Sequence, residues 1–129
     1  MPKQYYYAGS AHMLLGDAEQ AQQNCLLAIA MYDAGPAELR SYGDEALARV
    51  DVTTARLALG DLDGAREALR PVLELAPERR IEQLAVGLGR VPSALTAPRY
   101  ARVPLAREIA QEVDHFQAES VANSLLLTR

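Results

Sequence analysis

Residues 55–69 read ARLALGDLDGAREAL, and residues 11–25 read AHMLLGDAEQAQQNC. Both stretches contain Leu-Gly-Asp, and both place an alanine four residues after the aspartate. Glycine is favoured just past the end of a helix, and aspartate is favoured as the cap of the next helix. The matching residues therefore predict two helical hairpins whose turns lie 44 residues apart.

Glycine and proline divide the whole chain into about six expected helices. The expected spans are residues 3–15, 17–34, 37–59, 62–75 and 77–95, with a sixth helix beginning near residue 105. Gly43 weakens the third helix, so its start is expected nearer Asp44. Pro71 is expected to bend the fourth helix or to remove one of its hydrogen bonds. The apolar stripe of the fourth helix includes Leu73, and that of the sixth includes Phe116.

The C-terminal third is less regular. Gly87, Gly89 and Pro92 weaken the second half of the fifth helix. Residues 96–104 contain two prolines and are expected to form a loop. Residues 121–127 are expected to form an extra apolar turn, a frayed tail or a docking segment.

Length and composition indicate a single all-α domain. The chain has 129 residues, half of them apolar, with much alanine and few β-branched residues. Its net charge of −4 argues against direct nucleic-acid binding, which depends on Lys and Arg that neutralise phosphates. No apolar run approaches the ~20 residues that span a bilayer, and the first residues lack the apolar stretch of a signal peptide. We therefore expect a cytoplasmic protein that binds neither nucleic acid nor membrane.

The pattern of turns and small residues resembles the tetratricopeptide repeat, in which glycine makes a tight turn and small residues let paired helices lie close together. The resemblance implies antiparallel helical hairpins stacked as a short right-handed superhelix. Repeat 1 is expected at about residues 3–35, repeat 2 at about 37–76, a less regular capping pair at about 78–118 and a tail at 119–129. The residues assigned to repeat packing are Tyr5, Ala8, Gly9, Gly16, Ala21, Ala28, Gly60, Ala65 and Leu69.

The second repeat departs from the family pattern in its first helix. Arg49, Val52, Thr53 and Arg56 stand where the family places its large and small packing residues. The spacing of 44 residues also exceeds the roughly 34 residues of the family's repeat. The third helix is therefore expected to start early or to carry an insertion.

A second resemblance rests on four short runs: YGDEALAR at 42–49, ALGDLDGA at 58–65, LRPVL at 69–73 and PERRI at 77–81. These runs are similar to the C-terminal portion of actinobacterial helix-turn-helix transcriptional regulators. In such regulators a DNA-binding domain precedes a tetratricopeptide-like region that senses a ligand or a partner. No DNA-binding helix pair precedes the repeats here, so we expect either a part trimmed of that domain or a free-standing relative.

The repeat register predicts a concave binding groove. The residues expected to face it are Tyr6, Ser10, Met13, Val50, Thr54 and Leu57. Such a surface is mildly apolar and carries hydroxyl groups, so it suits an amphipathic helix, an apolar peptide or a small apolar ligand. The alternative is that Tyr6 and Met13 pack against a neighbouring helix or a second copy of the chain.

Candidate metal and nucleophile sites fail on their residue sets. Asp61 and Asp63 lack the further oxygen ligands of a calcium loop. His12 and His115 have no second His or Cys one helical turn away, so no zinc site is expected. Cys25 takes a buried packing position and is expected to be inert. We therefore expect no metal and no cofactor.

The leading functional expectation is a non-catalytic binding module. It would be the sensing region of a transcriptional regulator or an orphan adaptor derived from one. One alternative is a small biosynthetic enzyme, or a small-molecule-binding protein, that uses the groove as a pocket. The sequence offers only Asp51 and His12 as an acid–base pair for that enzyme. Another alternative is a structural homodimer.

Overall fold

The computed structural model describes residues 17–34, 42–76 and 82–127, with the side chains of residues 17–32, 43–76 and 83–122. The helices are α2 (Ala18–Ala34), α3 (Tyr42–Ala58), α4 (Leu62–Leu73), α5 (Glu82–Leu88), α6 (Arg90–Leu95), a 3-10 helix (Pro98–Tyr100) and α7 (Pro104–Leu127). The described ranges contain no strand, which confirms the all-α class. The helix expected at residues 3–15 lies outside these ranges.

Aspartate side chains cap two of the helices. Asp17 Oδ1 accepts a hydrogen bond of 3.1 Å from the backbone N–H of Gln20 at the start of α2. Asp61 Oδ1 accepts one of 2.9 Å from the N–H of Gly64 at the start of α4. Between α3 and α4, Gly60 has a φ of 84°, which glycine adopts without a steric penalty. The second Leu-Gly-Asp therefore forms the turn and the cap that the sequence predicts.

The prediction of one continuous helix at residues 77–95 is wrong, because the chain divides at Gly89 into α5 and α6. Pro92 explains the division. It has no N–H to bond the carbonyl of Leu88, and its ring clashes with that carbonyl in a regular helix. α4, in contrast, continues through Pro71. There the proline costs one hydrogen bond without ending the helix.

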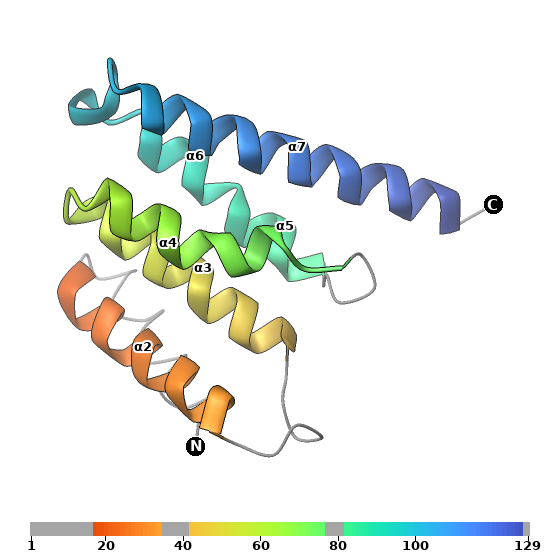
Figure 1. Ribbon diagram of the computed structural model, residues 1–129, viewed down its shortest axis with the longest axis horizontal. Coiled ribbons are helices and arrows are strands. Elements are labelled where there is room, and N and C mark those ends of the chain that lie inside the picture. The colour runs from red at the N-terminus through yellow and green to blue at the C-terminus, as the bar shows by residue number, and fades with distance from the viewer. Residues whose placement is uncertain (1–16, 35–41, 77–81, 128–129) are drawn as a thin grey trace.

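The C-terminal segment is a long helix. Residues 96–103 form the predicted loop, which contains the short 3-10 helix. α7 then runs without a break to Leu127, and Figure 1 shows its C-terminal half projecting past the other helices. The described part of the tail expected at 119–129 therefore belongs to α7. Of the three possibilities for residues 121–127, the structure shows additional helical turns.

α3 is the central helix of the described region (Figure 1). It packs against α2, α4, α5 and α6, while α7 packs on α4 and α6. A helix with neighbours on several sides is buried nearly all round rather than along one stripe. The buried residues of α3 are Glu45, Ala46, Ala48, Val50, Asp51, Val52, Thr53, Thr54, Ala55 and Leu57.

Two apolar clusters hold the helices together. The larger cluster joins α3 to α4, α5, α6 and α7 through residues such as Leu57, Leu69, Leu88 and Ile109. The smaller cluster joins α2 to α3 and α4 through Cys25, Ile29, Ala48, Val52 and Ala68. Because α4 and α7 both pack on the larger cluster, they lie next to each other with their outer faces exposed.

Candidate functional site

Three residues expected to line an open groove lie in the interior instead. Val50 is 1% and Leu57 is 2% exposed, and both belong to the larger cluster. Thr54 is also buried, and its hydroxyl donates a hydrogen bond of 3.0 Å to the backbone carbonyl of Asp51. The expectation fails because α5 and α6 cover this side of α3, so that a Cβ on Gly87 would stand 3.5 Å from Val50 Cγ1. The other three groove residues, Tyr6, Ser10 and Met13, lie outside the described residues.

The repeat-packing residues that the structure describes are in the interior or at the turn. Ala21, Ala28, Ala65 and Leu69 are each 0% exposed, and Gly60 occupies the turn between α3 and α4. The remaining residues of that set lie outside the described ranges: Tyr5, Ala8, Gly9 and Gly16.

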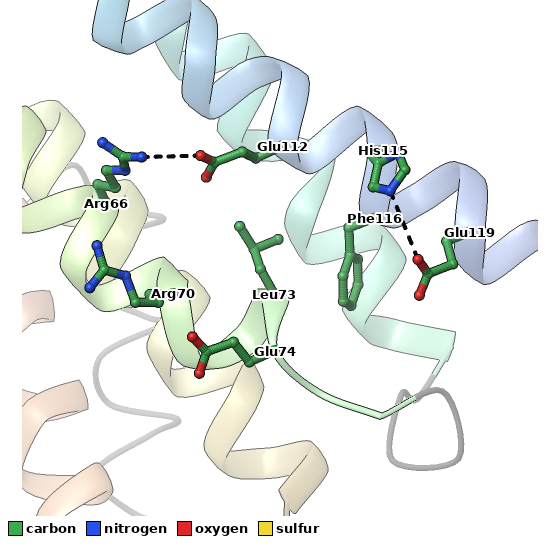
Figure 2. A pocket seen from close by; sticks show the side chains of 8 residues that line it. All are labelled: Arg66, Arg70, Leu73, Glu74, Glu112, His115, Phe116 and Glu119. Atoms are coloured by element: carbon green, nitrogen blue, oxygen red, sulfur yellow. Dashed lines mark hydrogen bonds and ion pairs between the residues drawn. The ribbon is translucent and has the colours of Figure 1, made fainter.

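The described residues form an open cleft between α4 and α7, with a volume of about 330 Å³ (Figure 2). Its lining residues are Arg66, Arg70, Leu73 and Glu74 of α4 and its C-cap, and Glu112, His115, Phe116 and Glu119 of α7. We call this site the α4–α7 cleft. It combines an apolar floor with charged side chains from both helices.

Ion pairs from Arg66 close one end of the α4–α7 cleft. Its Nη2 lies 3.3 Å from Glu112 Oε1, and its Nη1 lies 3.9 Å from Glu108 Oε2. All three side chains are between a third and two thirds exposed, so each pair contributes only about 0–1 kcal/mol. They bridge α4 and α7 at this point.

The floor of the cleft is formed by Leu73 and Phe116, which point into the space between the helices in Figure 2. Phe116 is 5% exposed and belongs to the larger apolar cluster, while Leu73 is half-buried against that cluster. A guest side chain placed between them would contact an aromatic ring and an aliphatic side chain. Burial of apolar area is the main source of affinity that such a floor offers.

Arg70 and Glu74 flank Leu73 on the same face of α4. The two charged residues are four positions apart, about one helical turn, and both side chains are exposed. Within the described part of the chain, neither side chain forms an ion pair. On the opposite wall, His115 Nε2 lies 3.9 Å from Glu119 Oε2, and the His115 side chain is 85% exposed.

The described side chains include Cys25 and Asp51, which the sequence offers as chemical groups. Burial, and to a smaller degree the charge of Asp51, raises the pKa of the Cys25 thiol to about 12, so the thiol stays protonated near neutral pH. The described residues contain no group of three or more His, Cys, Asp or Glu side chains placed to hold a metal ion. Asp51 is buried with its carboxylate 4.0 Å from Arg90 Nη1, and its expected acid–base partner His12 lies outside the described residues.

The sequence places Leu73 and Phe116 on the apolar stripes of two separate helices, but it does not predict that both line one cleft. Nor did it single out Arg66, Arg70 or Glu112. The available signal was the pair Arg70 and Glu74 bracketing an apolar residue on α4, which alone is common on exposed helices.

Comparison with models of protein families, with curated proteins and with solved structures finds no match for this chain. Among the helices that the structure describes, none has the length and apolar character needed to cross a membrane. The function must therefore be argued from the geometry of the α4–α7 cleft.

Proposed function

We propose that this chain is a non-catalytic binding module whose α4–α7 cleft holds a segment of a partner protein. The composition of the cleft supports the proposal, because Leu73 and Phe116 form an apolar floor between exposed charged side chains. Protein-binding sites commonly combine an apolar centre, which supplies affinity, with a polar rim that remains in contact with water.

The setting that we propose is the sensing or interaction region of a cytoplasmic transcriptional regulator, or an adaptor derived from one. The resemblance of residues 42–81 to such regulators supports this setting. The packing of α3 on α4 and of α6 on α7 supports tetratricopeptide-like hairpins stacked as a right-handed superhelix.

A small molecule is the second candidate occupant, favoured by the volume of about 330 Å³, which lies near the lower end of small-molecule sites. Such sites bury most of the ligand surface. Here Arg70, Glu74 and His115 are exposed, so the cleft is open along its rim. The open rim favours a peptide segment over a small molecule.

Site-specific photocrosslinking tests the proposal. A benzophenone amino acid replaces His115, which lines the cleft, and in a control it replaces the neighbouring Asp114, which is exposed but does not line it. In cells of the native host, we expect the position-115 variant to crosslink to one partner protein. The position-114 variant should not crosslink to it.

A third protein carries the position-115 crosslinker together with Leu73→Asp, and it should lose the partner while keeping its helical circular dichroism. Equal crosslinking from positions 114 and 115, or retention of the partner by the Leu73→Asp protein, would contradict cleft binding. A crosslink between two copies of the chain would favour the structural homodimer instead.

A further inference from the structure

We infer that the partner segment is a helix with an acidic and a basic residue one turn apart and an apolar residue between them. The acidic residue faces Arg70, the apolar residue enters between Leu73 and Phe116, and the basic residue faces Glu74. This inference rests on the proposed function and specifies the chemistry of the occupant.

The first argument is the geometry of α4. Arg70, Leu73 and Glu74 stand at positions i, i+3 and i+4, which lie on one face of a helix. All three line the α4–α7 cleft, as Figure 2 shows. The rise of about 1.5 Å per residue places the two charged residues roughly 6 Å apart along the helix axis. A partner helix repeats that spacing with its own residues at i and i+4.

The second argument is the contrast between two arginines one turn apart. Arg66 is engaged by Glu108 and Glu112 of α7, and these ion pairs close one end of the cleft. Arg70 has no ion pair within the described residues, although it lines the same cleft. Glu74, also unengaged by ion pairs in that part of the chain, supplies the opposite charge beyond Leu73. On α4, the charges available to a guest are therefore one positive and one negative, in a fixed order.

The third argument separates affinity from selectivity. Exposed ion pairs contribute little binding energy, whereas burial of an apolar side chain between Leu73 and Phe116 contributes more. The charges act on which segment binds and in which direction it lies, because a reversed segment would place like charges opposite each other. An anion alone does not satisfy the site, since Glu74, Glu112 and Glu119 also line it.

The experiment uses a phage-displayed library of helical peptides with randomised surface positions, selected on the full chain. Peptides enriched on the wild type should carry the acid–apolar–base pattern in one order along the sequence. The double variant Arg70→Glu, Glu74→Arg keeps the net charge and should enrich the opposite order. It should fold normally, because an acidic residue preceding a basic one at i, i+4 is the better arrangement in a helix.

The matched control exchanges charges outside the cleft. Arg107→Glu with Asp114→Arg also keeps the net charge, and both residues are exposed on α7 without lining the cleft. This control should enrich the same order as the wild type. We expect the wild type to bind a selected peptide about tenfold more tightly than the same peptide with its acidic and basic residues exchanged.

The outcomes separate the two proposals. Peptides that lose binding to Leu73→Asp but show no charge order, or show the same order on both proteins, would overturn the inference and leave cleft binding intact. Absence of any cleft-dependent enrichment would also overturn the inference. In that case the crosslink from position 115 still decides the proposed function, because it reports the native partner.

Discussion

The phenol of Tyr100 donates a hydrogen bond of 2.6 Å to the backbone carbonyl of Leu57, 43 residues earlier in the chain. Leu57 lies in the last turn of α3, where carbonyl groups lack partners within the helix. The guanidinium of Arg99 donates a longer bond of 3.3 Å to the next carbonyl, that of Ala58. The short 3-10 helix therefore caps the C-terminus of α3 and ties the segment between α6 and α7 to the α3–α4 turn.

Tyr100→Phe removes the hydroxyl but keeps the buried ring. Leu57 O also accepts a bond of 3.2 Å from the N–H of Gly60, so the carbonyl keeps one partner. We therefore expect a loss of about 1 kcal/mol in the free energy of unfolding, rather than the larger cost of an orphaned carbonyl. Urea denaturation followed by circular dichroism measures it.

Thr96→Val is the matched control, because it also removes a hydroxyl that donates to a backbone carbonyl. The Thr96 Oγ1 bond to Ser93 O is 2.6 Å but exposed, so its loss should change stability by no more than about 0.5 kcal/mol. If both substitutions lowered the free energy of unfolding equally, the hydrogen bond between Tyr100 and Leu57 would contribute no more to stability than an exposed local one.

The Tyr100–Leu57 bond shows what local sequence patterns do not contain. The caps at Asp17 and Asp61 were predictable, because donor and acceptor lie three residues apart and depend on residue type. The acceptor of Tyr100 is a backbone carbonyl, which every residue carries, so no residue identity marks the partner. Only the packing of α6 and α7 on the rest of the fold decides which carbonyl it reaches.

Gly60→Ala and Gly89→Ala are the same substitution with opposite expected results. Gly60 has a φ of 84°, and a Cβ there would stand 2.9 Å from Arg99 Nη1, so alanine should cost about 1–2 kcal/mol of stability. Gly89 has a helical φ of −62°, and a Cβ there would make ordinary van der Waals contacts of 3.4 and 3.6 Å with two backbone oxygens, so alanine should stabilise by about 0.4–1 kcal/mol. Thermal unfolding of both variants measures the two changes in stability. A loss of stability in both would contradict the stabilisation expected at Gly89.

The α4–α7 cleft could not be predicted from the sequence for a related reason. Leu73 and Phe116 could be assigned to the apolar stripes of their own helices, but their place in one cleft depends on how α7 packs against α4. The burial of Val50 and Leu57 likewise depends on tertiary packing. Both are expected to face the groove, yet α5 and α6 pack on this side of α3 and make them part of the core.

Arg56, one of the residues that departs from the repeat pattern, connects three helices. From α3, its Nε donates a bond of 2.8 Å to Gln22 Oε1 of α2, and its Nη1 donates one of 2.8 Å to Gly64 O of α4. Lysine cannot reproduce this fork, so Arg56→Lys should cost about 1–2 kcal/mol of stability. Arg102→Lys, at an exposed position in the loop, is the control and should be neutral. Guanidinium denaturation gives both values, and a neutral Arg56→Lys would show that the fork is dispensable.

Cys25 predicts how stability depends on alkaline pH. The folded state raises the pKa of its thiol from 9.0 to about 12, so the unfolded chain ionises first as the pH rises. The contribution of the protonated thiol is complete below pH 9 and is lost as the pH rises toward 12. Cys25→Ala should be less stable at pH 7, since it leaves a cavity beside Ile29 and Val52, but its stability should fall less steeply between pH 9 and 11. The difference between the two proteins cancels the titration of tyrosine and lysine. Urea denaturation at pH 8, 9, 10 and 11 gives the free energy of unfolding of both proteins. If it fell with pH equally in the two, the thiol would ionise equally in the folded and unfolded states, contrary to its burial in the contact between α2 and α3.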